Sequence, residues 1–332
     1  MQNKLHYLKA RVEKVALAFL FSTSLIGCSS LSSEKTVNLS ANFSIPKEEI
    51  LINIQDEVER VKEQYYLFEL STDLETKATT NAQKADIFYK LGVVNYQLGL
   101  YAQSKLMFLN CLRLKSDYGP AYNFLGIFYA DEGNYVACYD AFDSAIELGD
   151  DQDFAFFNRS IALYYAGKKA RALTDVKLIT DFDNSDPYRS IWYFLIQRDL
   201  SGEASAITDL KIRNSFANKD GGEFGFAIIS YLLGDISKTD LFRSAKDPNL
   251  TITEQNELLC EIYFYLGKNA LYHGKKQEAY DYFRLCVLTS CYGFLEYRLA
   301  LIEIKQLEEE FFATQDKKAN KIINKEIEDI NE

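Results

Sequence analysis

Several residue types recur along this chain at a constant spacing of 34 positions, and this spacing restricts the possible folds more than any other feature. Gly99, Gly133 and Gly167 are the clearest members of the series. We call a set of positions separated by 34 residues a column. Four further columns have similar residue types: Phe88, Tyr122 and Phe156; Gly92, Gly126 and Ser160; Ser104, Cys138 and Ala172; and Phe108, Phe142 and Val176. Agreement across a whole set of columns indicates tandem copies of one structural unit.

The two glycines of the second unit lie in a segment with the apolar spacing of a helix, YNFLGIFYADEGNYVACYDAFDSAIEL. A glycine in a helix interior costs about 1 kcal/mol relative to alanine, so their recurrence needs a structural reason. We expect Gly126 to let two antiparallel helices cross closely, because a side chain there would push them apart. We expect Gly133 to end the first helix in a left-handed conformation that glycine adopts readily. Each unit is therefore predicted to be a helix-turn-helix hairpin.

The order of an aromatic residue, Leu-Gly, a turn glycine, a small residue and a phenylalanine within 34 positions resembles the tetratricopeptide repeat (TPR). This resemblance implies an all-α, TPR-like solenoid of helical hairpins with an N-terminal helix and a C-terminal capping helix. We assign the three clear repeats to residues 85–118, 119–152 and 153–186. The same columns return at Tyr263, Leu266, Gly267, Gly274, Ala279 and Phe283, which predicts a TPR-like repeat at residues 260–293.

The segments around these repeats are also predicted to be mainly helical. Residues 46–80 read as an N-terminal helical segment, because Pro46 suits the first turn of a helix. Asp186-Pro187 supplies an N-cap and a first helical residue for a degenerate helical pair at residues 187–215. The remaining assignments are a helical linker region at 216–259, a capping helix at 294–311 and a charged tail at 312–332.

The N-terminus has the pattern of a targeting segment rather than of a folded domain. Basic residues precede an uncharged apolar run, VALAFLFSTSLIG, and the run ends in Leu25-Ile26-Gly27-Cys28, which resembles a bacterial lipobox. We therefore expect residues 1–27 to be a lipoprotein signal peptide and Cys28 to be lipidated, with residues 28–45 as a flexible tether. The resemblance to Gram-negative lipoproteins implies that Ser29, in place of aspartate, favours sorting to the outer membrane, facing the periplasm. The alternative is an ordinary secretory signal in which the cysteine is incidental.

Charge and cysteine content exclude two classes of protein. The formal net charge of −11 at pH 7 gives no electrostatic footprint for nucleic acid. Besides Cys28 the chain has five scattered cysteines, Cys111, Cys138, Cys260, Cys286 and Cys291, which do not form a disulfide framework and are expected mostly in the core. Cys286 and Cys291 are the only pair close in sequence, and the sequence leaves open whether they are joined.

No pattern of catalytic residues is found in the predicted mature chain. His273 is its only histidine, and its place just before Gly274 favours a solvated or helix-capping role over catalysis. The sequence has no His-Glu-x-x-His, Gly-x-Ser-x-Gly or Cys-x-x-Cys motif. We therefore expect no enzymatic activity, no metal and no cofactor.

The first helices of TPR-like hairpins line a concave groove, which is the candidate protein-binding site. Counting along the three repeats places these side chains in it: Tyr89, Tyr96, Gln97, Asn123, Asp131, Phe157, Tyr164 and Tyr165. Aromatic residues with acids nearby suit capture of a helix or an extended segment of another protein. The alternative is that a helix of the same chain, or of a dimer partner, fills the groove.

Longer strings of the chain are similar to one family, the NlpI-type outer-membrane lipoproteins. The most specific are SDPYRSIWYFLIQRDL, FNRSIALYYAGKKARALTDV and YFYLGKNALYHGKKQEAYDYF with FLEYRLALIEI. The chain departs from the family at Ser160, where glycine is usual, and in its tether and tail. The resemblance implies a homodimeric adaptor without catalytic activity that binds peptidoglycan endopeptidases and a periplasmic processing protease, and so controls cell-wall growth or division. A TPR lipoprotein that acts as a pilotin or an outer-membrane assembly accessory is the alternative.

Overall fold

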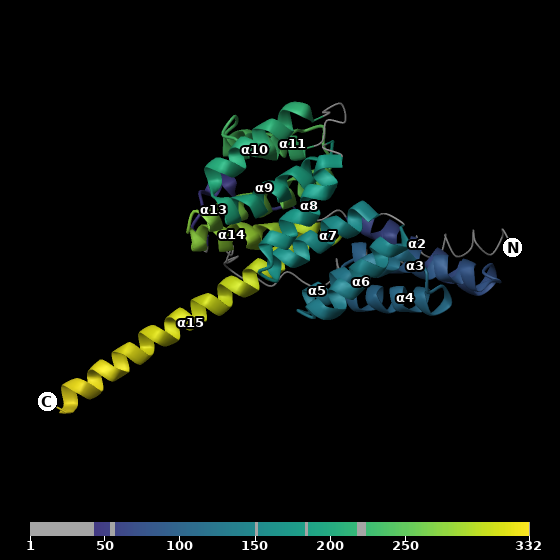
Figure 1. Ribbon diagram of the computed structural model, residues 1–332, viewed down its shortest axis with the longest axis horizontal. Coiled ribbons are helices and arrows are strands. Elements are labelled where there is room, and N and C mark those ends of the chain that lie inside the picture. The colour runs from purple at the N-terminus through teal and green to yellow at the C-terminus, as the bar shows by residue number, and fades with distance from the viewer. Residues whose placement is uncertain (1–42, 54–56, 150–151, 183–184, 218–223, 332) are drawn as a thin grey trace, which may run out of the picture. The chain divides into compact units, whose positions relative to one another are not determined.

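The computed structural model describes residues 43–53, 57–149, 152–182, 185–217 and 224–331. Within these residues all regular structure is helical and no strand is present. The predicted signal peptide, Cys28 and most of the predicted tether lie outside the described residues. The chain is a solenoid of helical hairpins, as the 34-residue columns predicted (Figure 1).

Three antiparallel hairpins make up the first part of the described chain. Helix α2 (Glu57–Thr76) precedes them and packs against α3. The hairpins are α3 (Asn81–Gln97) with α4 (Tyr101–Leu114), α5 (Gly119–Asp131) with α6 (Tyr135–Leu148), and α7 (Gln152–Tyr165) with α8 (Lys169–Phe182). Each pair lies within one of the three segments assigned as repeats, except that α3 starts four residues before residue 85 and α7 starts one residue before residue 153.

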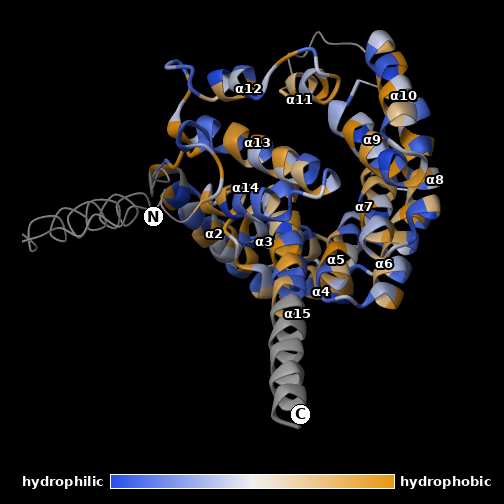
Figure 2. Ribbon diagram, turned by 90° about the vertical axis from the view of Figure 1, so that its left-hand side faces the viewer, coloured by the Kyte–Doolittle hydropathy of each residue, from blue (hydrophilic) through white to orange (hydrophobic). Residues whose placement is uncertain are grey.

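The second part of the chain has a larger core. Its helices are α9 (Pro187–Ser201), α10 (Glu203–Phe216), α11 (Gly225–Leu232), α12 (Lys238–Ser244), α13 (Ile252–Tyr272), α14 (Lys276–Leu288) and α15 (Leu295–Asn331). Helices α8 to α12 run around α13 (Figure 2). Trp192 of α9 is fully buried and its ring lies 6.3 Å from that of Phe264 on α13. Both α9 and α13 are enclosed by other helices, so residues on most of their faces are buried, including the charged side chains of Arg198 and Lys268.

Glycine and phenylalanine meet at the crossing point of three hairpins. A Cβ atom added to Gly126 would lie 2.7 Å from the ring of Phe142, and one added to Gly267 would lie 2.6 Å from the ring of Phe283. Gly92 has the same relation to Phe108. In each of these hairpins a fully buried phenylalanine ring of the second helix packs directly against the glycine of the first. A larger residue than glycine would therefore force the two helices apart, and the glycine column is a packing requirement, as predicted.

The departure at Ser160 has a matching change on the facing helix. Val176 stands in the column that Phe108 and Phe142 occupy in the earlier repeats. Ser160 is fully buried, and its hydroxyl donates a hydrogen bond to the carbonyl oxygen of Phe157 at 2.7 Å. A slightly larger residue on α7 thus accompanies a smaller one on α8, and the hydroxyl is satisfied within its own helix.

The turn glycines adopt the left-handed conformation that the sequence predicted. Gly99, Gly133, Gly167 and Gly274 have φ between +72° and +74°. The residue after each glycine donates its backbone N–H to a carbonyl of the preceding helix, as Asn134 does to Tyr129 at 2.9 Å. These bonds satisfy carbonyl groups that the end of a helix leaves unpaired.

Residues 43–53 differ from the continuous helix expected after Pro46. Only Lys47–Glu49 form a short 3-10 helix, and α2 begins at Glu57. The segment instead bonds to the last hairpin: the Ser44 hydroxyl donates to Asp281 at 2.6 Å, and the Leu51 N–H donates to the Tyr263 hydroxyl at 2.7 Å. Hydrogen bonds to distant side chains replace those that a helix would have made. They fix Ser44, in the predicted tether, to α14 and Leu51, in the predicted helical segment, to α13.

We predict that Gly126→Ala lowers the free energy of unfolding by up to about 2 kcal/mol. The added methyl group forces the Phe142 ring to shift, at a cost of about 1 to 3 kcal/mol, while alanine returns about 1 kcal/mol of helix propensity. Chemical denaturation followed by circular dichroism measures the change. Phe142→Leu should partly restore the stability of Gly126→Ala.

Gly133→Ala is the matched control for this prediction. No atom lies within 4 Å of the added methyl group, so its cost comes only from the positive φ and amounts to about 1 kcal/mol. Phe142→Leu should add its full cost in the Gly133→Ala background. Equal effects of Phe142→Leu in both backgrounds would show that the crossing is not limited by the ring.

Candidate protein-binding site

Helix α15 of the same chain lies over the inner helices of the second and third hairpins. The Arg298 guanidinium is 2.5 Å from the Asp131 carboxylate at the end of α5. The Tyr165 hydroxyl at the end of α7 donates to the Glu303 carboxylate at 2.7 Å. Just before α15, the backbone carbonyl of Tyr292 accepts a bond from the Tyr101 hydroxyl at 2.9 Å. The groove predicted from the repeats is thus partly filled by the chain's own capping helix.

A buried ion pair joins α15 to α13, in addition to the contacts of α15 with α5 and α7. Lys268 of α13 and Glu303 are each 4% exposed, and their charged groups are 2.6 Å apart. Lys268 also donates to the Tyr164 hydroxyl at 3.1 Å, and Tyr164 donates to Asp199 of α9 at 2.8 Å. Helices α7, α9, α13 and α15 therefore share one polar network, in which removal of any charged member leaves another unpaired.

The pKa values in this network follow from burial and charge. Burial lowers the pKa of Lys268, but Glu303 and Tyr164 outweigh it, so the pKa is raised above its ordinary value. Burial and the neighbouring Glu303 carboxylate raise the pKa of Tyr165. Lys268 therefore stays charged and Tyr165 stays a hydrogen-bond donor throughout the physiological pH range.

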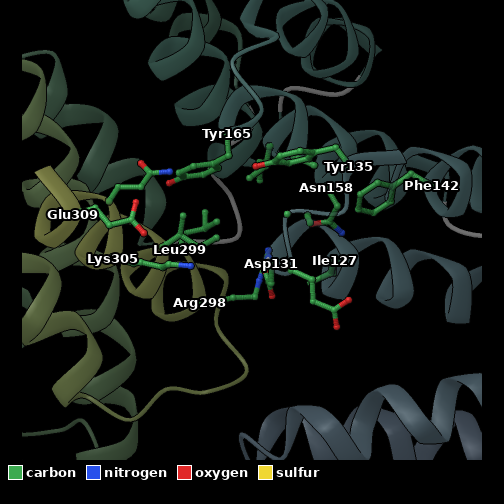
Figure 3. Close-up of a pocket in the computed structure, with 17 residues that line it drawn as sticks. Ile127, Asp131, Tyr135, Phe142, Asn158, Tyr165, Arg298, Leu299, Lys305 and Glu309 are labelled. Carbon is green, nitrogen blue, oxygen red and sulfur yellow. Dashed lines mark hydrogen bonds and ion pairs between the residues drawn. The ribbon is translucent and has the colours of Figure 1, made fainter. Parts of the chain in front are cut away.

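A pocket of about 240 Å³ remains between the repeats and α15. Figure 3 shows Arg298 pointing toward Asp131, with Tyr135 and Tyr165 on the opposite side of the pocket. Its walls come from α5, α6, α7 and α15 and combine apolar side chains with both signs of charge, including Ile127, Asp131, Tyr135, Asn158, Ile161, Tyr165, Arg298, Leu299, Lys305, Gln306 and Glu309. An apolar surface with a few directed polar groups is suited to holding one or two side chains of a peptide.

Charges in the pocket are only partly neutralised by one another. Burial raises the pKa of Asp131, and the adjacent Arg298 opposes this effect. Arg298 is 8% exposed, and its guanidinium pairs with the Asp131 carboxylate. Lys305, Gln306 and Glu309 are exposed at the mouth of the pocket and are its adaptable polar groups.

The eight predicted groove residues do not all lie in one place. Asp131 and Tyr165 line the pocket, and Asn123 lies beside it, accepting a hydrogen bond from Asn158 at 3.1 Å. Tyr164 belongs to the network around Lys268. The other four residues lie elsewhere. Tyr89 packs against Tyr118 and Phe108, and Tyr96 is buried, with 7% of its surface exposed. Phe157 packs on the core of the second part of the chain, and Gln97 lies beside Gly293 at a different pocket.

Several pocket residues were missed because they come from a distant part of the chain. Arg298, Lys305, Gln306 and Glu309 all belong to α15. One signal was present in FLEYRLALIEI, where Glu296, Arg298 and Glu303 interrupt an apolar run. Charged residues in such a run need polar partners when the helix is buried, but nothing local identifies those partners.

In the described residues, no group of three or more His, Cys, Asp or Glu side chains is placed to hold a metal ion. None of the described helices is long and apolar enough to cross a bilayer. His273 is the C-cap residue of α13, and its imidazole is 43% exposed and 3.6 Å from Glu203.

Three solved structures of helical-repeat proteins are distantly similar to this chain. No family model matches the chain. YrrB, a TPR protein with an unusual peptide-binding site, is 13% identical, with 65% of this chain and 89% of YrrB covered and a TM-score of 0.36. A TPR protein from Parabacteroides merdae is 12% identical, with 76% and 94% covered and a TM-score of 0.47. PilF of Pseudomonas aeruginosa is 13% identical, with 76% and 92% covered and a TM-score of 0.41.

The TPR-like solenoid of helical hairpins is seen in the chain itself, in its 34-residue columns, its hairpins and the glycine crossings at Gly92, Gly126 and Gly267.

We predict that Lys268→Met destabilises the protein by about 3 to 5 kcal/mol, because the Glu303 carboxylate is left buried without its cation. Lys276→Met is the matched control. Lys276 pairs with Glu310 on the surface, where both side chains are about half exposed, so its loss should cost about 1 kcal/mol or less. Denaturant midpoints measure both changes.

The double variant Lys268→Met/Glu303→Leu should recover much of the lost stability, since no unpaired charge remains at the ion pair. If Lys268→Met were no more destabilising than Lys276→Met, the ion pair would not hold α15 in the groove.

Proposed function

We propose that this chain is a non-enzymatic adaptor, anchored by Cys28 to the outer membrane and facing the periplasm, that binds segments of other proteins at the groove of its repeats. The observation that carries the proposal is the pocket between α5, α7 and α15. It has apolar walls, fixed charges and a mouth of exposed polar residues, and it lies where TPR-like hairpins present their inner helices.

The clients we propose follow from the resemblance to NlpI-type lipoproteins: peptidoglycan endopeptidases and a periplasmic processing protease. An adaptor needs no chemistry of its own to control hydrolase turnover. Two partners held on one anchored body meet at a raised effective concentration, which increases the rate at which the protease acts on the hydrolase. Control of hydrolase turnover would in turn affect cell-wall growth or division.

Helix α2 supports the proposal that the protein is a homodimer. Val61, Tyr65 and Phe68 are 56%, 52% and 64% exposed, and they follow one another at steps of four and three residues. This spacing forms one apolar stripe along a helix and is the spacing by which two helices pack together. The buried face of α2, which includes Leu70, is directed to α3. The stripe is thus left for a second helix, such as α2 of another copy.

The proposed anchor is tested by Cys28→Ser. Without the thiol no lipid can be attached, so we predict that the variant moves from the membrane fraction to the soluble periplasmic fraction. Fractionation followed by immunoblotting measures this shift, with Cys111→Ser as the control that keeps the lipobox. If Cys28→Ser still sediments with outer membranes, lipidation of Cys28 is not the anchor.

The proposed client site is tested by Gln306→Trp, which places a large ring in the mouth of the pocket. We predict at least tenfold weaker binding of a purified endopeptidase from the same host, which corresponds to about 1.4 kcal/mol. Lys305→Glu reverses a charge at the same mouth and should also weaken binding. Calorimetric titration measures the affinities, and circular dichroism confirms that the variants are folded.

Lys211→Glu, an equivalent charge reversal at an exposed position of α10, is the matched control and should bind as the unmodified protein does. Unchanged affinity in both pocket variants would place the client elsewhere. Recovery of secretin or barrel-assembly subunits from membranes, without any endopeptidase or protease, would instead favour the role of pilotin or assembly accessory.

A further inference from the structure

A second pocket of about 240 Å³ shares no lining residue with the pocket between the repeats and α15. Its walls come from four segments that are distant in the sequence: α2, the end of α3, the first turns of α13 and the turn between α14 and α15. These segments contribute Glu63, Gln97, Asn256 and Phe294, among others. Pockets between packed helices are common ligand sites, so the chemistry of these walls indicates what could bind there.

Two neighbouring side chains of α13 in this pocket are left without the partners that their polar groups need. Asn256 is 4% exposed, and its Oδ1 atom has no hydrogen-bond partner. Burial and then the Glu254 carboxylate raise the pKa of the half-buried Glu257, and no cation of the described residues opposes this effect. A buried acceptor without a donor and a carboxylate without a cation are both unfavourable. One ligand group that carries N–H donors and a positive charge would satisfy both.

The remaining walls are mainly neutral. Leu98 and Phe294 supply apolar surface, and Thr253 adds a hydroxyl group. The Cys291 thiol also lines the pocket and is free, so Cys286 and Cys291, the pair that is close in sequence, are not joined. Apolar walls beside a few polar groups suit a ligand that combines a hydrocarbon stem with a charged end.

The N-terminus of α13 does not make this pocket a site for anions. The Thr251 hydroxyl accepts from the Glu254 N–H at 3.2 Å, and the Glu254 carboxylate accepts from the Thr251 N–H at 2.7 Å. This capping box places a negative charge at the positive end of the helix dipole. The charged residues that line the pocket are Arg60, Glu63 and Glu257, whose charges add up to a negative value.

We propose that this pocket binds a primary ammonium group, carried either by a lysine side chain of another protein or by a free amine. The ammonium group donates one hydrogen bond to Asn256 Oδ1 and a second to the Glu257 carboxylate. Its hydrocarbon stem lies along Leu98 and Phe294. The net charge of −11 favours the approach of such a cation. The site is separate from the groove, so it does not depend on the proposed clients.

The test is a titration of the full mature chain with small probes, followed by nuclear magnetic resonance. Nα-acetyl-lysine methylamide should bind, whereas its Nε-acetylated form, which has the same stem without the charge, should not. Butylammonium carries the same group without a peptide backbone. Equal affinity of butylammonium and the lysine probe would show that a free amine is sufficient, and tighter binding of the lysine probe would favour a protein side chain. Either result supports the site.

Two variants separate binding from stability. Glu257→Gln keeps the shape of the side chain and removes its charge, so it should weaken binding of the lysine probe by about tenfold or more. Asn256→Leu should also weaken binding, but its denaturation midpoint should be equal to that of the unmodified protein or higher, because an unpaired buried atom is removed. Glu147→Gln, at an exposed position of α6, is the matched control and should leave the affinity unchanged.

Three results would overturn the proposal. The first is no binding of the lysine probe or of butylammonium at millimolar concentration. The second is binding that Glu257→Gln weakens no more than Glu147→Gln does, which would show attraction to the acidic surface as a whole. The third is binding of acetate that Asn256→Leu abolishes, which would make the pocket a site for anions. The unmodified chain gives the first answer, so that part of the test does not depend on whether a variant folds.

Discussion

The Glu303 carboxylate is the contact on which the arrangement of the groove depends. It lies between Lys268 of α13 and Tyr165 of α7; Lys268 and Glu303 are withdrawn from water, and Tyr165 is half-buried. In this position it joins the three-hairpin part of the chain to the last hairpin through α15. A carboxylate in such surroundings is tolerated only when its partners are all in place, so the pair specifies one position of the helix rather than merely adding stability.

A groove that contains its own capping helix is a different binding surface from an open one. The aromatic side chains of Tyr96, Tyr164 and Tyr165 are used within the chain. What is left for a client is a small pocket, with Lys305, Gln306 and Glu309 at its mouth. Under the proposed function, such a site would admit one or two side chains of a peptide, and affinity for a whole protein would come from several contacts or from the proposed dimer.

The local parts of this structure were predictable and the distant contacts were not. Gly126 and Gly133 predicted a hairpin because each has a reason that acts within one repeat. The docking of α15 could not be predicted, since periodicity records which face of a helix is apolar but not which helix covers it. The conformation of residues 43–53 could not be predicted for the same reason. Their hydrogen-bond partners, Tyr263 and Asp281, are more than 200 positions away in the sequence.

The position of α15 is tested most directly by chemical cross-linking inside the pocket. Ala130 on α5 and Gln306 on α15 both line the pocket, so the test uses Ala130→Cys together with Gln306→Cys. Cys291→Ser is added to remove the partly exposed native thiol. A short bismaleimide should join Cys at 130 to Cys at 306 in the folded protein, and should not join Cys at 306 to Cys at the exposed position 211 of α10. Absence of the first cross-link, when each cysteine alone is labelled, would contradict the self-filled groove.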